Sequence, residues 1–433
     1  MFKSKQIFKL FSFTAGLFIY GGGTILLIIM SANAISNIVY QKQFNDIKDE
    51  IFMEYNYLKM RLDEPDKKTK TSTDGFKDFT SSEWPLMTLS LFCYGTRNLA
   101  LYDPSIKKEA EYYIAKAIRR VIKPEYYNFI TPYYGNPFST DEINDNAFYL
   151  GHVLVMLSSY REISDDSSFD DLFHKFSLAF YHNFKESPTC SLDSYPGQCW
   201  ASEQALPLRA LKIHDNIFGT NYSAMLVRWK NTMTERFIES QSHLLVTLYD
   251  KQSGYIMEGP RTITNTWTIL FLHDMLPEFC ERLYLETKKI FLIKRLGFPV
   301  FKEYMGEKQV STDDTGPIIW SISASSTCFA MGCAAIYGDD EVFYALNKLA
   351  DCFGMAFEYG DKRKYLLGGD IGTAAAFFCR SMILVRDQKD DSEPVKLQND
   401  YWFVLPAVLL LLTGLMIWRL FLAISPAVRS FRK

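Results

Sequence analysis

Two cysteines and one histidine combine residue types and spacing that suit chemistry. Cys190 and Cys199 lie nine residues apart and bracket a segment that contains Tyr195, Pro196 and Gly197. In an oxidising compartment the pair can close this segment as a disulfide, and the alternative is two thiols in an active site. His152 opens an apolar run. It is either a base for proton transfer near neutral pH or a satisfied core histidine.

Carboxylates near the starts of apolar segments are further candidates for acid/base work. Those that we consider as catalytic are Asp145, Glu203 and Asp314. Two facing carboxylates would suffice for glycoside hydrolysis, because they can divide the acid role from the base or nucleophile role. The competing interpretation is that each acid caps a helix or interacts with its dipole. The segment Thr312–Pro317 has the composition of such a helix start.

Aromatic side chains and one arginine indicate where a substrate could bind. The candidate binding residues are Tyr149, Tyr195, Trp200, Tyr255, Arg261 and Trp267. Arg261 could hold an anionic or polyhydroxyl ligand, and its alternative is an ion pair with Glu258. The sequence contains no His-Glu-x-x-His, Cys-x-x-Cys or Gly-x-Ser-x-Gly motif. We therefore predict neither a metal site nor a cofactor.

Paired helices must position these residues. Six long connections rich in aromatic residues, Gly, Pro, Ser, Thr and Asp each lead into an apolar helical segment, roughly 50–70 residues after the previous one, which is the signature of a structural repeat. These segments begin near Trp84, Asp145, Trp200, Trp267, Ile318 and Ala374. More charged segments alternate with them and, together with a helix over 44–62, complete six pairs. The pattern predicts an all-α (α/α)6 toroid, with an open solenoid as the alternative. In a toroid the six long loops share one face and form a bowl.

Apolar, uncharged stretches flank this region. Leu10–Met30 and Tyr401–Trp418 are long enough to cross a bilayer, although the first could instead be a cleaved signal peptide. Every Asp and Glu lies between Asp46 and Asp400, whereas lysines precede the first stretch and arginines follow the second. The positive-inside rule then places both termini in the cytoplasm. We expect an anchor over 1–40, an exported toroid over 41–398, and a membrane helix with a basic cytoplasmic tail over 399–433.

Composition excludes some classes of protein and narrows the expected partners. The chain has 433 residues, of which 48% are hydrophobic and 22% charged, so it is not intrinsically disordered. Its net charge is −3, and the interior has no Lys- and Arg-rich run, which argues against a nucleic-acid partner. The expected partners are the lipid bilayer of a bacterial inner membrane and a small-molecule or glycan ligand. An oligomer is compatible with the fold, because toroids can pack side by side.

The motif Tyr149-x-Gly151-His152, followed by Cys190 and Cys199, resembles the linalool dehydratase/isomerase-type toroids. The resemblance implies an exported, cofactor-free (α/α)6 enzyme that adds or removes water and shifts a double bond in a small terpenoid alcohol. It further implies functional positions for His152 and both cysteines, helped by a nearby acid. The segments Ser194–Trp200 and Asp314–Pro317 are similar to a broader group of bacterial membrane-anchored toroids.

Three functions follow from these observations. The first is a membrane-anchored lyase or isomerase of the hydro-lyase type that acts on a small hydrophobic alcohol. The second is a glycan-active hydrolase or lyase that stacks sugars on its aromatic residues and uses two carboxylates. The third is a non-catalytic envelope subunit whose bowl binds a ligand or a protein.

Overall fold

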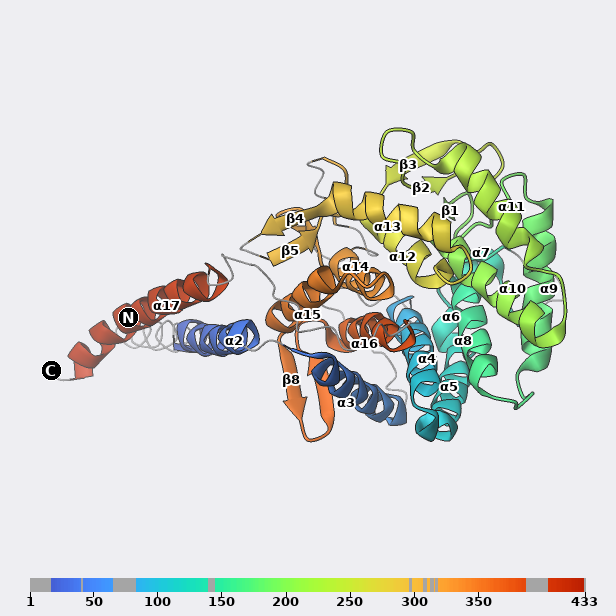
Figure 1. Ribbon diagram of the computed structural model, residues 1–433. Coiled ribbons are helices and arrows are strands. Elements are labelled where there is room, and N and C mark those ends of the chain that lie inside the picture. Colours follow the sequence, from blue (N-terminus) through green and yellow to red (C-terminus); the bar gives the residue numbers. More distant parts are fainter. Residues whose placement is uncertain are drawn as a thin grey trace, which may run out of the picture.

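The computed structural model describes residues 17–39, 42–64, 83–138, 145–295, 298–306, 310–311, 315, 318–386 and 404–431. The predicted catalytic residue Asp314 lies outside these residues, as do parts of both predicted membrane spans. The described chain is mostly helical, and Figure 1 shows its paired helices arranged around a common centre.

Six apolar helices form the inner layer. They are α4 (Glu83–Tyr102), α8 (Tyr149–Ile163), α10 (Ala205–Phe218), α12 (Thr262–Leu272), α14 (Ala324–Ile336) and α16 (Gly369–Val385). Each packs against the next in chain order, and α16 packs against α4. The inner layer is therefore a closed ring, which confirms the predicted helical toroid and not the open solenoid.

Six more amphipathic helices cover the ring. They are α3 (Phe44–Asp63), α5 (Lys107–Val121), α9 (Asp170–Glu186), α11 (Ala224–Thr232), α13 (Pro277–Phe291) and α15 (Asp340–Gly354). Five of them follow their inner partners directly, and α3 packs on α16, the last inner helix. Short turns join the pairs: α10 ends at Gly219, whose φ of 70° suits glycine, and α13 begins at Pro277 in its first turn. The outer helix α3, which precedes all the other paired helices in the sequence, thus packs on the last inner helix and completes the outer layer.

Buried charged side chains connect α3 with α15 and α16, at the place where the first and last helical pairs meet; we call this place the seam. Arg380 of α16 donates to Glu54 of α3 and to Asp351 of α15, the latter over 2.8 Å. Arg363 also pairs with Asp351, and Lys42 pairs with Asp351 and Glu50. We call these six residues, Lys42, Glu50, Glu54, Asp351, Arg363 and Arg380, the seam cluster. Its three acids and three bases balance in formal charge.

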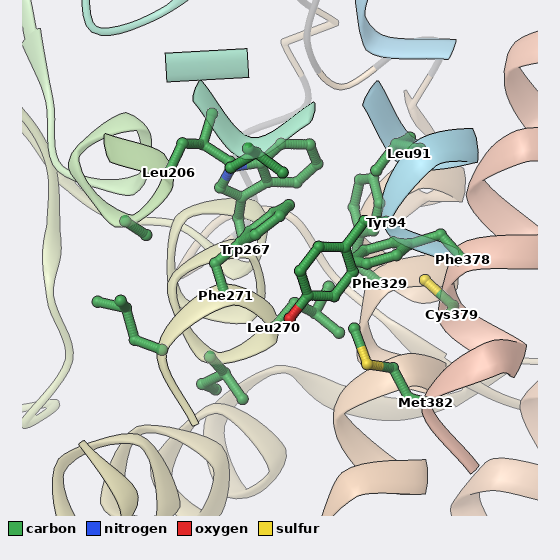
Figure 2. Packing of buried hydrophobic residues seen from close by; sticks show 14 of the residues in the cluster. Leu91, Tyr94, Leu206, Trp267, Leu270, Phe271, Phe329, Phe378, Cys379 and Met382 are labelled. Atoms are coloured by element: carbon green, nitrogen blue, oxygen red, sulfur yellow. The ribbon is translucent and has the colours of Figure 1, made fainter. Parts of the chain in front are cut away.

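Aromatic side chains fill the axis of the ring. Tyr94 of α4 lies with its ring centroid 5.4 Å from Phe271 and 5.3 Å from Phe378, and Trp267 lies 4.9 Å from Phe329. Figure 2 shows these rings converging from α4, α12, α14 and α16. The axis is thus a packed core and not a channel, so any site must lie towards the ends of the helices.

Short strands occur in the long loops, where the sequence predicted only helices and loops. The three-stranded sheet comprises β1 (Cys199–Trp200), β2 (Val246–Tyr249) and β3 (Ile256–Pro260). The two-stranded sheets are β4 (Leu292–Arg295) with β5 (Phe298–Phe301), β6 (Ile318–Ile319) with β7 (Ile322–Ser323), and β8 (Ala356–Tyr359) with β9 (Lys362–Tyr365). The predicted helix start near Ile318 is therefore wrong, because β6 and β7 precede α14. β-Branched and aromatic residues in these segments favour strands.

The remaining helices lie outside the ring or in its loops. Two of them, α2 (Gly22–Val39) and α17 (Val404–Phe431), pack against each other and project from the ring (Figure 1). Short helices are η1 (Leu17–Gly21), η3 (Pro104–Ile106), α6 (Pro124–Tyr127), α7 (Thr131–Tyr134), η4 (Ser202–Gln204) and η5 (Met233–Phe237). Within the part of the chain that the structure describes, we find no helix with the length and apolar content needed to cross a membrane. The predicted spans over Leu10–Met30 and Tyr401–Trp418 lie partly outside the described residues and remain predictions.

Candidate functional site

His152 lies in the first turn of α8 and is fully buried between aromatic rings. Its ring centroid is 5.1 Å from that of Phe148 and 5.9 Å from that of Trp267. Burial lowers the pKa of His152 to about 3, so the imidazole is neutral at physiological pH. We call the group formed by these three side chains, His152, Phe148 and Trp267, the His152 chamber.

The polar atoms of this chamber lack protein partners. Among the described residues, nothing hydrogen-bonds to either ring nitrogen of His152 or to the indole nitrogen of Trp267. Leaving a buried polar atom unpaired costs about 1–3 kcal/mol, and most such atoms in folded proteins are paired. Two adjacent unpaired groups are thus suited to a ligand that carries one hydroxyl group on an apolar body.

A phenol with two nearby carboxylates also packs against Phe148. The ring of Tyr195 stacks on Phe148 at 6.2 Å, and its hydroxyl donates to the carboxylate of Glu83. Burial, together with the charges of Glu83 and Glu203, raises the pKa of Tyr195 well above its usual value. Tyr195 is therefore a protonated hydroxyl close to the chamber. Glu83 begins α4, where the sequence alone suggests only a helix-start acid.

Apolar side chains near the loop ends of the inner helices keep part of their surface exposed. They are Met87 of α4, Ile263 of α12, Cys328 of α14 and Ala375 of α16. Because outer helices cover the outward sides of these helices, the exposed parts face the loop end of the ring. The loop end of the ring therefore presents apolar surface that suits an apolar ligand.

Arg261 is committed to protein partners. Its side chain is buried, and its Nε donates to Glu303 over 2.8 Å, while Nη1 lies 3.4 Å from Glu258. The guanidinium also lies over the rings of Trp200 and Tyr304. The predicted ion pair with Glu258 is present, and the shorter contact is to Glu303.

Cys190 and Cys199 are both free thiols and both buried. Cys190 Sγ lies 3.7 Å from the carbonyl of Met225, and Gln204 donates to Cys199 Sγ over 3.6 Å. Burial raises the pKa of Cys190 to about 11 and that of Cys199 further, so both are protonated at neutral pH. Among the described residues, neither thiol interacts with His152. The structure thus shows two free thiols and no disulfide between them.

A polar pocket opens beside the chamber. It encloses about 410 Å³ and is lined by Tyr133, Tyr134, Asp145, Asn183, Asp193, Pro196 and Lys251. The ammonium group of Lys251 pairs with Asp145 and lies 3.4 Å from Asp193. Burial, with smaller contributions from Asp193 and Cys199, raises the pKa of Tyr134 well above its usual value. We call this space the Lys251 pocket.

The remaining predicted residues lie apart from these two places. Tyr149 is buried and donates its hydroxyl to the carbonyl of Val121 over 3.0 Å, so it serves packing between α8 and α5. Tyr255 is 71% exposed beside β3. Among the described residues, no group of three or more His, Cys, Asp or Glu side chains could hold a metal ion.

Lys251 was not among the predicted site residues. Lys251 lies in a turn between β2 and β3, and its carboxylate partners belong to two other loops. A lone lysine in a turn looks like a solvated residue, so only the fold reveals its role.

Fold and site together define an enzyme-like helical toroid. The linalool dehydratase/isomerase family model matches residues 173–363, which confirms the resemblance seen in the sequence. The matched segment contains Cys190 and Cys199 and begins after His152.

Three solved structures are similar to the chain. An unsaturated glucuronyl hydrolase specific for heparin is 11% identical, with a TM-score of 0.45, over 69% of this chain and 85% of that chain. A family 105 glycoside hydrolase from C. acetobutylicum ATCC 824 is 12% identical, with a TM-score of 0.39, over 68% and 93%. A polysaccharide lyase is 12% identical, with a TM-score of 0.48, over 79% and 98%. Likeness at this level says nothing of activity.

Proposed function

We propose that the chain is a cofactor-free acid/base lyase or isomerase that acts on a small hydrophobic alcohol in the His152 chamber. The observation that carries this proposal is the fully buried, neutral imidazole with both ring nitrogens unpaired. The match to the linalool dehydratase/isomerase family supports the same class of reaction. The apolar residues at the loop end of the ring favour a substrate with little polarity.

The reaction needs one acid and one base. In dehydration, the C–O bond breaks as the leaving oxygen takes a proton, a neighbouring C–H bond loses its proton to the base, and a double bond forms. The products are an alkene and water, so no oxidant or reductant is required. His152 serves as the base, and Tyr195, which also packs against Phe148 and whose hydroxyl donates to Glu83, serves as the acid. General acid–base catalysis of this kind contributes about 10²–10⁴-fold in rate.

The test is a comparison of two buried histidines. Small alkenols are incubated with the wild-type chain, with His152→Ala and with His214→Ala, and alkene or isomer formation is measured by gas chromatography. His214 is also buried, but its ring nitrogens contact His174 and Thr220, both at 2.8 Å. We expect His152→Ala to lose at least about 100-fold in rate at an unchanged melting temperature. Full activity in His152→Ala would refute the proposal.

A glycan-active toroid is the second candidate, and the carboxylates of the Lys251 pocket favour it. Asp145 and Asp193 flank one ammonium group in an open pocket, and burial raises the pKa of Asp193, as a general acid requires. Glycosidases, however, keep the space between their carboxylates free for the sugar and water. Here Lys251 occupies that space. Release of reducing sugar from oligosaccharides by the wild type, but not by Asp193→Asn, would favour this candidate over the first.

We also propose that residues 41–398 are exported and held at a bacterial inner membrane with both termini in the cytoplasm. The charge pattern of the sequence and the exposed apolar side chains of α2 and α17, such as Ile25, Leu26, Leu411 and Phe421, support this location. Alkaline phosphatase joined after residue 386 should be active, and the same enzyme joined after Lys433 should be inactive. The reverse pattern would refute the proposal.

A further inference from the structure

We propose that the Lys251 pocket is a carbohydrate-binding site that prefers neutral or amine-bearing sugars to uronic acids, and that it works independently of the His152 chamber. The pocket's volume of about 410 Å³ lies within the range of small-molecule sites and can hold a single sugar ring. Its walls come from α7, α9 and three connecting segments, so the fold assembles it from distant parts of the chain.

An unpaired acceptor in the wall indicates what the ligand must offer. The Oδ1 atom of Asp193 is buried and has no hydrogen-bond partner among the described residues. The other oxygen accepts from the backbone N–H of Gly197 over 3.3 Å and faces Lys251. A hydroxyl or ammonium group of a ligand would satisfy Oδ1, because both donate hydrogen bonds to a carboxylate.

An aromatic ring supplies a surface for the apolar face of a sugar. Tyr133 is 59% exposed, yet its ring is fixed edge-on against Tyr195 at 6.0 Å. Tyr134 and Pro196 extend this wall. A flat apolar wall beside hydrogen-bonding groups matches a pyranose, which presents C–H groups on its faces and hydroxyl groups at its edge.

The charge of the pocket determines which sugars fit. Lys251 supplies one positive charge, and Asp145 and Asp193 supply two carboxyl groups. The ammonium group is thus already paired and cannot serve as a free cation for a sugar carboxylate. A uronate would add a negative charge beside two others, whereas the ammonium group of an amino sugar would balance one of them.

The loops around the pocket are tied together before any ligand arrives. The backbone carbonyl of Lys251 accepts from Thr189 over 3.0 Å, and that of Asp193 accepts from the N–H of Ala147 over 3.0 Å. A site that is ordered in advance loses less entropy on binding. We therefore expect that the binding of single sugars, although weak, can be measured and differs between sugars.

The experiment titrates the full chain with glucosamine, glucose and glucuronate and follows binding by ligand-observed NMR. We expect saturable binding in the order glucosamine, glucose, glucuronate, with at least a five-fold difference between the first and the last. Absence of saturable binding of all three, or tightest binding of glucuronate, would overturn the proposal.

Variants locate the site. Tyr133→Ala should weaken the binding of glucose and glucosamine at least about five-fold through loss of the aromatic wall. The matched control is Tyr112→Ala, because Tyr112 is similarly exposed, at 56%, on the outer helix α5. Asp193→Asn should reduce the preference for glucosamine over glucuronate. Unchanged binding in both Tyr133→Ala and Asp193→Asn would overturn the assignment to this pocket.

A last variant separates this proposal from the proposed function. His152→Ala should abolish turnover of alkenols and leave sugar binding unchanged. If no alkenol is turned over by any variant while the sugar order holds, only the lyase proposal fails. If sugar binding is lost in His152→Ala, the two sites are one, and the proposed independence is wrong.

Discussion

The seam cluster and the His152 chamber both contain buried polar side chains, but the two places differ in how these side chains are paired. At the seam, every buried charge has an oppositely charged partner, as in the contacts of Arg380 with Glu54 and Asp351. In the chamber, His152 and Trp267 have polar atoms that nothing in the described chain pairs. Single atoms at the seam, such as Glu54 Oε2, also lack a hydrogen-bond partner in the described part of the chain, but each charged side chain there is paired through another atom. Neither ring nitrogen of His152 has a partner among the described residues, so the imidazole as a whole is available to a ligand.

The largest effect should come from breaking the seam. Arg380→Met removes the guanidinium group that contacts two buried carboxylates and should lower the free energy of unfolding by about 3–5 kcal/mol. Urea denaturation followed by circular dichroism measures it. Arg386→Met is the control, because Arg386 pairs with Asp340 in a more exposed place and should cost less than about 1 kcal/mol. Equal losses would show that the seam is no more important than a surface ion pair.

The raised pKa of Glu54 should make the free energy of unfolding depend on pH. Burial outweighs the attraction of the arginines and raises the pKa of Glu54 from 4.5 to about 7. Since the folded pKa exceeds the unfolded one, this contribution to stability is complete below pH 4.5 and is lost as the pH rises to about 7. Its size is on the order of 3 kcal/mol. Glu54→Gln should remove this slope from urea midpoints measured between pH 4 and 8, and an unchanged slope would contradict the prediction.

The two buried histidines should differ in stability as well as in activity. His214→Leu breaks contacts to His174 and Thr220 and should cost about 1–3 kcal/mol. His152→Leu removes an unpaired imidazole from an aromatic setting, so its unfolding free energy at pH 8 should stay within about 1 kcal/mol of the wild type. Thermal and urea denaturation measure both variants. A larger loss of unfolding free energy in His152→Leu would indicate that His152 serves the packing of the core and not a ligand.

The smallest effect concerns two tyrosines. Tyr149→Phe removes the hydroxyl that donates to Val121 and should cost about 1 kcal/mol without changing activity. Tyr195→Phe removes the proposed acid, so turnover should fall while stability changes little. Alkenol turnover and melting temperature, measured for both variants, test the pair. Equal activity in the two variants would remove Tyr195 from the mechanism.

Local patterns made the ring predictable. An apolar helix followed by an amphipathic one buries its surface against its sequence neighbour, so alternating segments sufficed to predict the pairs. The position of His152 at the start of an inner helix was likewise visible in the run that it opens. The strand Val246–Tyr249 was missed although β3 follows it as a hairpin, because β2 also pairs with the distant β1 and tertiary context decides short strands.

The site was predictable only in part, for a related reason. Resemblance suggested Cys190 and Cys199, and the structure shows their thiols in contact with Met225 and Gln204, which the sequence did not indicate. Lys251 could not be foreseen, because Asp145 and Asp193 reach it from loops that precede α8 and follow α9. Such groupings depend on how the loops fold over the ring, which helical periodicity does not encode.

Closure of the ring by α3 on α16 has a consequence for synthesis in the cell. The partner of the first helix is the last inner helix, so α3 emerges from the ribosome long before α16 exists. At about 5–20 residues per second, the apolar side of α3 waits for tens of seconds. During that time the nascent chain is an open arc with two unmatched ends, which is the stage at which chaperones or a second nascent chain could engage it.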